Sequence, residues 1–338
     1  MVQSIIGLWG VSVTPLLLFQ VRYLVNKRIL TILETLGVCI LFALGVILMK
    51  VGLKSVDAIT LAWLPLAIGM LGMCAYTFGI KRRPIPKKLD RKIWIYIFII
   101  GICNFTISRM VKPFALETMP ANTYSYLTQF QGFVTMALSV AILREVPTVW
   151  QLVGAAVAFG GLRLFFFQVP STQEWLGIIL IAVAWLATAY TNNATRKVML
   201  VTNNGIDNTV FSTLTILIGG IVAIVIGLLL GGLPHVPDLA SWGVILYLGL
   251  VWIAFNLTAW NFFLRTLRSY EASILSASVV IFTALLSLVR LGEKLALNQV
   301  FGILTMIIGL ALVQVRAGRL DVLWQRIFKR REVPEKSA

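Results

Sequence analysis

Residues 249–312 read GLVWIAFNLTAWNFFLRTLRSYEASILSASVVIFTALLSLVRLGEKLALNQVFGILTMIIGLAL, a mostly apolar stretch. Shifted by 148 residues, residues 101–161 match it without a gap. The matching positions hold glycines, hydroxyl residues, a glutamate and others: Gly101/Gly249, Phe114/Phe262, Leu116/Leu264, Thr118/Thr266, Ser125/Ser273, Leu138/Leu286, Ser139/Ser287, Glu145/Glu293, Gln151/Gln299, Gly154/Gly302 and Gly161/Gly309. Chance rarely supplies so many identities in apolar sequence, so we infer that the chain is a duplication.

The rest of the chain is equally apolar. Of 338 residues, 59% are hydrophobic and 12% are charged, and the mean hydropathy is +0.91. Soluble domains are about 45–50% apolar and about 25% charged. A helix needs about 20 apolar residues to cross a hydrocarbon layer about 30 Å thick, and such stretches recur almost from end to end. The composition therefore predicts an all-α polytopic membrane protein.

Charges and prolines divide the chain into ten apolar segments, five in each half of the duplication. We place them at Thr31–Val51, Ala58–Ile80, Ile93–Val111, Ala121–Leu143, Trp150–Phe167, Trp175–Ala194, Val210–Gly231, Trp242–Leu264, Ala272–Val289 and Val300–Val315. Because each half has an odd number of spans, the second half enters the membrane from the side opposite to the first. The two repeats are therefore inverted, which is a recurrent plan of secondary transporters. The expected domains are a hydrophobic segment with a basic linker (1–28), two five-helix repeats (29–168 and 169–316) and a basic tail (317–338).

The segment Ile5–Gln20 precedes these ten. It is apolar but short for a span, and Gly7, Gly10 and Pro15 interrupt it. It has neither a basic start nor a clear cleavage site of small residues, so we do not expect a signal peptide. The segment is therefore either an extra N-terminal hydrophobic helix that crosses the membrane or one that lies at its surface, and the sequence favours neither alternative.

Basic residues gather in alternate connections, which predicts the orientation. The formal charge is +16, and cytoplasmic loops retain Lys and Arg. With the start of Thr31–Val51 inside, residues 81–92, the Arg196–Lys197 pair and the tail from Arg316 also lie inside. We expect an integral protein of the cell (inner) membrane of a prokaryote, with the termini of its core in the cytoplasm. The high charge then needs no nucleic acid.

The chain offers little material for catalysis or metal binding. Cys39, Cys74 and Cys103 lie inside apolar segments, and His235 is the only histidine. Acid–base and metal chemistry need clustered acidic, His or nucleophilic groups, whereas the carboxylates here are scattered at helix ends. We therefore expect no enzyme, no cofactor and no metal site.

Residues 249–312 resemble an EamA repeat of the drug/metabolite transporter superfamily. The resemblance is carried by Gly-Glu-Lys at residues 292–294 and by Gln299-x-x-Gly302 beyond it. The first half matches more loosely, through Arg144-Glu145, Gln151-x-x-Gly154 and Gly161. Together the two repeats cover nearly everything from Leu33 to Val315.

The resemblance implies a ten-helix fold with both core ends cytoplasmic, and exporters or exchangers of metabolites as relatives. Family members often carry a proline in the fourth and ninth helices. This chain has Gln129-Phe130-Gln131 and Ser278-Val279-Val280 in that neighbourhood. It departs from the family pattern there.

The fourth and ninth segments each carry polar residues at helical spacing. These are Tyr124, Thr128, Gln131, Thr135 and Ser139, and then Ser276, Thr283 and Ser287. Polar groups are costly in hydrocarbon and normally face a cavity or another helix. We expect Tyr124, Thr128, Gln131 and Ser276 to line a substrate pathway. For the smaller hydroxyls the alternative is a bond to the backbone of their own helix or contact with a neighbouring helix.

The third and eighth segments carry polar and aromatic residues at steps of four. The repeat relates Asn104, Ser108 and Lys112 to Trp252, Asn256 and Trp260. At about 1.5 Å per residue, Asn104 and Asn256 lie about 16–18 Å from the helix starts, close to the midplane. We expect these faces to bind substrate. Packing or an interfacial belt is the alternative for the two tryptophans.

Arg109 and Lys112 lie deeper than most other charged groups. Lys50, Arg163 and Arg290 approach helix ends, where their side chains can snorkel to the interface. Arg109 and Lys112 lie beside the face of Asn104 and could attract an anionic group.

Two functional classes remain. We favour a secondary carrier (exporter, facilitator or exchanger) that moves a small metabolite by alternating access through a polar–aromatic cavity. The alternative is a membrane-embedded enzyme acting on a lipid or isoprenoid. The expected partners are a small-molecule substrate and the lipid bilayer, and paired glycines seven residues apart leave a homodimer open. No carboxylate or histidine falls near the midplane, which favours a facilitator or exchanger over proton coupling.

Overall fold

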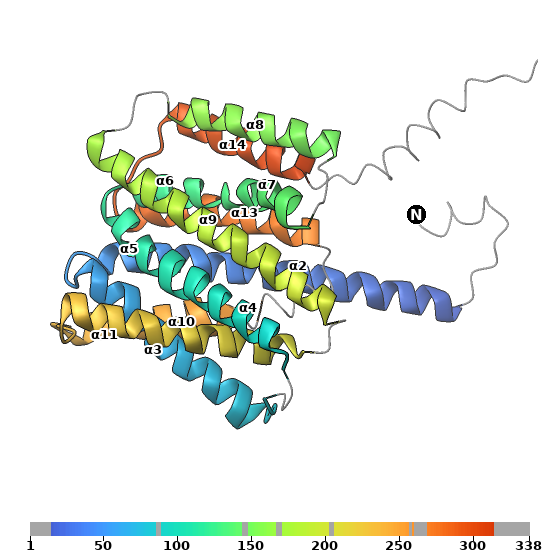
Figure 1. The fold of residues 1–338 in the computed structure, drawn as a ribbon. Helices are drawn as coiled ribbons and strands as arrows, with labels where there is room; N and C mark the ends of the chain where they lie inside the picture. Colours follow the sequence, from blue (N-terminus) through green and yellow to red (C-terminus); the bar gives the residue numbers. More distant parts are fainter. Residues whose placement is uncertain are drawn as a thin grey trace, which may run out of the picture.

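The computed structural model describes residues 15–85, 89–143, 148–166, 171–202, 206–256, 259 and 269–313, and every regular element in these ranges is helical (Figure 1). The first half contributes α2 (Pro15–Gly52), α3 and the π-helix η2 (Ala58–Cys74, Ala75–Ile80), α4, η3 and α5 (Arg91–Gly101, Ile102–Ser108, Arg109–Glu117), α6 and α7 (Ala121–Thr128, Gln131–Leu143) and α8 (Val149–Phe165). The second half contributes α9 (Thr172–Val201), α10 (Asn208–Gly231), α11 and η4 (Leu239–Leu246, Tyr247–Phe255), α13 (Ser269–Arg290) and α14 (Leu297–Val313).

These elements form ten apolar helices, which confirms the predicted all-α polytopic fold. Six of them are long and apolar enough to cross a membrane. The four shorter ones are Val149–Phe165, Leu239–Phe255, Ser276–Arg290 and Leu297–Leu312. We call the end of the bundle near Arg82 and Arg83 the basic end, and the end near Gly52 and Glu117 the opposite end.

Helix α2 is a single helix of 38 residues. At about 1.5 Å per residue it is about 57 Å long, and its candidate span is Leu30–Gly52. Figure 1 shows its first turns extending beyond the other helices. The end of the hydrophobic segment Ile5–Gln20 is thus the start of α2, and residues 1–14 lie outside the described part of the chain.

The fourth span is interrupted although no proline is present. Helix α6 ends at Thr128 and α7 begins at Gln131. Between them the Gln129 amide donates to the Tyr126 carbonyl at 3.2 Å, and the Phe130 amide donates to the Leu127 carbonyl at 3.0 Å. Both bonds reach back three residues, so the turn is tightened relative to an α-helix. The equivalent helix α13 is continuous.

Two glycine contacts display the duplication in three dimensions. A Cβ added at Gly101 in α4 would lie 2.7 Å from the Thr215 carbonyl oxygen in α10 and 3.1 Å from the Gly219 amide. A Cβ added at Gly69 in α3 would lie 2.9 Å from the carbonyl oxygen of Gly249, the repeat partner of Gly101. The third helix of each repeat therefore packs backbone to backbone on the second helix of the other.

Glycines also join the fifth and tenth helices, α8 and α14, which lie side by side in Figure 1. A Cβ added at Gly302 would lie 2.9 Å from the Gly161 carbonyl oxygen, and one added at Gly309 would lie 2.6 Å from that of Gly154. Small residues let helices approach closely in lipid, where packing drives association. The predicted glycine faces are thus used within the chain, and a homodimer stays a prediction.

Candidate functional site

The site lies where the third and eighth spans depart from regular α-helix. Residues 102–108 form η3 and residues 247–255 form η4, at overlapping positions of the two repeats. Such π-helical turns are frequent at functional sites. They bring Arg109 and Lys112, at the start of α5, close to Trp252 of η4.

A small cavity separates these side chains. Its walls come from α2, α3, α5 and η4, and are formed by Met49, Leu61, Ala62, Pro65, Arg109, Lys112, Pro113, Leu248, Trp252 and Ile253. The space open to water-sized groups is about 10 Å³, room for about one water molecule. The structure thus describes the site in a closed form, with two cationic side chains at an otherwise apolar wall.

The indole of Trp252 fixes the position of Arg109. The Arg109 Cζ lies 5.5 Å from the centre of the Trp252 ring, a cation–π contact. Trp252 lies against α2 at Gly45, where an added Cβ would come within 2.7 Å of the ring. The backbone of α2, the indole and the guanidinium therefore form one stack.

Two polar atoms of this region are buried and have no hydrogen-bond partner in the described part of the chain. They are the indole nitrogen Nε1 of Trp252 and the amide oxygen Oδ1 of Asn256, one helical turn further along. Buried polar groups in proteins are normally hydrogen-bonded. An unpaired donor and acceptor near the cavity are therefore groups that a bound molecule could satisfy.

The charges of Arg109 and Lys112 are not balanced within the described residues. No ion pair or hydrogen bond between described side chains involves either of them. The Tyr124 hydroxyphenyl group, 2% exposed, lies close enough to Arg109 to interact electrostatically. The site is thus electropositive, with a phenol rather than a carboxylate beside it.

Three other expected site residues lie on the third and fourth spans, outside the wall of this cavity. Asn104 is partly buried on η3. The hydroxyl groups of Ser108 and Thr188 are 2.7 Å apart and join the third span to α9. The Thr128 hydroxyl donates to the Ser125 carbonyl within α6. Both hydroxyls are therefore already engaged in this conformation.

Two more expected residues lie on the fourth and ninth spans. Gln131 opens α7 and is partly buried, and its backbone carbonyl accepts a bond from Thr135. Ser276 is partly buried on α13. Trp260 lies outside the described residues. Of the eleven expected residues, the structure thus places Arg109, Lys112 and Trp252 on one cavity wall.

Helices α6 and α13 are joined at the opposite end of the bundle. The Glu293 carboxylate accepts the backbone amides of Ala121 and Asn122, at 2.9 and 3.2 Å, and so caps the start of α6. The Ser287 hydroxyl donates to the Asn122 side-chain oxygen at 2.7 Å. The Ser125 hydroxyl donates to that of Thr283 at 3.2 Å. We call this set of contacts the α6–α13 seam.

The seam residues of α13 and their repeat equivalents in α7 differ in burial and in hydrogen bonding. Thr283 and Ser287 are fully buried. Their equivalents in α7, Thr135 and Ser139, are partly exposed, and their hydroxyls bond to carbonyls of their own helix at 2.9 and 2.7 Å. Identical sequence positions are thus buried between helices in one repeat and open in the other.

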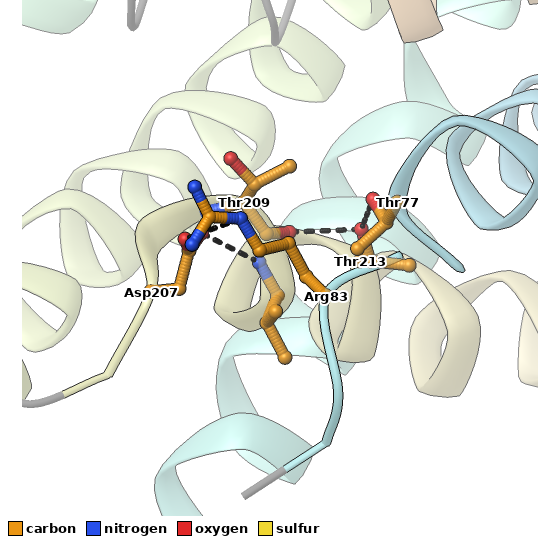
Figure 2. Close-up of polar contacts among 6 residues, drawn as sticks. Thr77, Arg83, Asp207, Thr209 and Thr213 are labelled. Atoms are coloured by element: carbon orange, nitrogen blue, oxygen red, sulfur yellow. Dashed lines mark hydrogen bonds and ion pairs between the residues drawn. The ribbon is translucent and has the colours of Figure 1, made fainter. Parts of the chain in front are cut away.

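The second and seventh spans are joined at the basic end (Figure 2). The hydroxyls of Thr77 and Thr213 are 2.7 Å apart, and Thr213 donates to the Thr209 carbonyl at 2.8 Å. Asp207 caps α10 by accepting the Thr209 amide at 2.8 Å, and Arg83 Nε lies 3.6 Å from the same carboxylate. This joint connects the end of the second span to the start of the seventh.

The sequence interpretation did not single out three side chains that the structure makes noteworthy. Pro65 lies inside α3 and lines the cavity. Trp63 and Trp185 each bury an indole nitrogen that has no hydrogen-bond partner among the described residues. A proline within an apolar segment was a usable signal, whereas nothing in the sequence separates these tryptophans from ordinary core residues.

Comparisons with known proteins agree with this architecture. The model of the EamA-like transporter family matches residues 29–167 and 170–315. No curated protein matches the chain. A solved structure, described as "Crystal structure of protein", is similar over 88% of this chain and 99% of its own length, with 14% sequence identity and a TM-score of 0.62. That likeness concerns the fold alone.

Proposed function

Because the chain belongs to the EamA-like transporter family, we propose that it is a secondary carrier that moves a small metabolite across the membrane by alternating access. The substrate would bind between the halves, next to Arg109, Lys112 and Trp252. Inverted repeats suit this mechanism because exchanging the conformations of the two halves converts an opening on one side into an opening on the other.

The α6–α13 seam is the observation that carries the proposal. Thr283 and Ser287 are buried in the seam, whereas their repeat equivalents Thr135 and Ser139 are partly exposed. Two halves with the same sequence pattern thus adopt different contacts. If the halves exchange these arrangements, the seam between the fourth and ninth spans opens at the opposite end. The same two spans then close together at the basic end.

The distribution of charge suggests which compartment faces each end. The basic end carries Arg82, Arg83 and Lys92, and basic loops are retained in the cytoplasm. With that orientation, the seam closes the pathway toward the outside. The described conformation then represents a carrier that is closed to the outside.

A reversible cross-link across the seam tests the mechanism. The paired variant Ser125→Cys and Thr283→Cys places two thiols where hydroxyls now lie 3.2 Å apart, in a background with Cys39, Cys74 and Cys103 replaced by Ser. In proteoliposomes loaded with a metabolite mixture, oxidation should stop exchange of labelled substrate, and reduction should restore it. Each single cysteine variant is the control. Full exchange by the oxidised, cross-linked pair would contradict alternating access at this seam.

A further inference from the structure

We propose that the cavity beside α5 and η4 binds the oxyanion of the substrate, a carboxylate or a phosphate, between Arg109 and Lys112. The inference rests on the proposed carrier function and names its substrate class. Arg109 and Lys112 are three residues apart on one helix, so their side chains share a face. Both line the cavity, and no described carboxylate pairs with either of them.

The depth of the two cations argues against a purely structural role. Arg109 lies eight residues before Glu117, where α5 ends, which corresponds to about 12 Å along the helix. A lysine at a helix end in this protein finds backbone partners, as Lys50 does. Its ammonium group donates to the carbonyls of Leu116 and Met119 at 2.6 and 2.8 Å. The Lys112 ammonium has no such acceptors among the described residues.

Two neighbouring cations in an apolar wall are unfavourable by themselves. Each loses part of its hydration, and each repels the other. A bound oxyanion would offset both effects. The guanidinium is a planar fork that matches a carboxylate or phosphate, whereas the ammonium acts as a point charge. Trp252 is a positioning residue in this arrangement, because its ring holds the guanidinium plane.

In the described conformation the cavity is too small for a carboxylate or a phosphate. The space of about 10 Å³ holds a single water-sized group, so the walls must separate to admit a carboxylate. A carrier changes between conformations in any case. The remainder of the substrate would extend toward the Asn256 amide oxygen, which is buried and accepts no hydrogen bond from the described residues.

Matched pairs of probes test the class of ligand. The full-length protein in detergent is titrated with glutamate against glutamine, benzoate against benzamide, and glucose 6-phosphate against glucose, and the melting temperature is measured. At least one anion should raise it, and its neutral partner should not. In Arg109→Gln and in Lys112→Gln the apparent Kd of that anion should be about 10- to 100-fold weaker, because a hydrogen bond to a charged group is lost.

Lys54→Gln is the matched control, since Lys54 is exposed in the turn between α2 and α3. It should bind the anion as the natural protein does. Without ligand, Lys112→Gln should melt at or above the natural temperature, because an uncompensated charge is removed. A lower melting temperature, unchanged anion affinity in both site variants, or the lack of any anion-dependent shift would overturn the inference.

Flux separates this inference from the carrier proposal. If the protein in proteoliposomes exchanges neutral probes but no anion, and Arg109→Gln does not change that exchange, the anion site is refuted and the carrier proposal stands. If anion binding depends on Arg109 and Lys112 but the protein exchanges no probe, the anion site stands and the carrier proposal is refuted.

Discussion

Lys50 and Lys112 both belong to apolar helices, but their ammonium groups have different surroundings. Lys50 lies near the end of α2 and donates to the carbonyls of Leu116 and Glu117 at the end of α5 and to that of Met119 just beyond it. The last carbonyls of a helix have no partners within the helix. Such a bond also complements the negative end of the helix dipole. Lys50 is therefore a cap between two helices, in place of the snorkelling side chain that the sequence suggested.

We expect Lys50→Met to lower the free energy of unfolding by about 1–3 kcal/mol, because charge-assisted bonds to partly buried carbonyls are lost. The measurement is thermal unfolding of the purified protein in detergent. Lys54→Met, which removes an exposed lysine four residues away, should change little. Equal melting temperatures for the two variants would rule out the capping role.

The sequence could identify charged residues in apolar helices but not their partners. Arg109 and Lys112 were predictable because charges deep in hydrocarbon are rare. Spacing alone could not reveal that Ser108 bonds Thr188 eighty residues away. A helical stripe defines a face, whereas the helix opposite that face depends on packing of the whole bundle.

At the scale of elements, Glu293 connects a loop of the second repeat to the first turn of α6. Its carboxylate accepts two backbone amides there, which are unsatisfied at a helix start. Glu293→Gln should weaken the seam, because an amide accepts with one oxygen only and carries no charge. In the background without native cysteines, a thiol at buried Ser125 should then react several-fold faster with a membrane-impermeant reagent. An unchanged labelling rate would show that the cap does not hold the seam closed.

The contact between α8 and α14 offers a test with neighbouring glycines. A Cβ at Gly161 would lie 2.8 Å from the Gly302 carbonyl oxygen, whereas one at Gly160 would meet nothing within 4 Å. Gly161→Ala should therefore destabilise the protein by about 1–3 kcal/mol through overpacking. Gly160→Ala should leave the melting temperature equal or slightly higher, since alanine favours helix. A Gly161→Ala variant as stable as Gly160→Ala would contradict the close backbone contact between α8 and α14.

Elements were predictable where apolar runs are long, as in Asn208–Gly231. The interruption at Gln129 and Phe130 was not, because the proline that would mark it is absent and the turn tightens through backbone bonds. The glycine faces of α8 and α14 were predictable as packing faces from their seven-residue spacing. Their mutual contact required the fold.

For the whole molecule, the asymmetry of basic residues predicts the orientation in the membrane. Arg82 lies exposed in the loop after η2, and Pro237 lies in the loop before α11. A cysteine at Arg82 should be labelled only from the cytoplasm, and one at Pro237 only from outside, because basic loops are retained inside. Labelling of intact cells and of inverted vesicles with an impermeant reagent decides between the two orientations. The reverse pattern would also reverse the assignment of the closed side.

The charges of the site bear on how the whole carrier cycles. With the site empty, Arg109 and Lys112 must change surroundings without a counter-charge, and moving unbalanced charge through a low-dielectric region is costly. With an oxyanion bound, part of that charge is neutralised, so the loaded carrier should reorient faster than the empty one. Described carboxylates such as Asp57, Asp207 and Glu293 cap helix ends, which fits coupling to a second substrate better than coupling to protons.

Exchange should therefore outpace net efflux for any anion that binds the site. The measurement loads proteoliposomes with labelled anion and compares its loss into buffer with its loss into buffer that contains the unlabelled anion. In Lys112→Gln, assayed at saturating anion, the two rates should approach each other, because the empty site then carries less charge. Lys54→Gln should keep the natural ratio. Equal rates of exchange and net efflux in the natural protein would mean that the empty site reorients freely, and accumulation driven by a pH gradient alone would mean that protons are coupled after all.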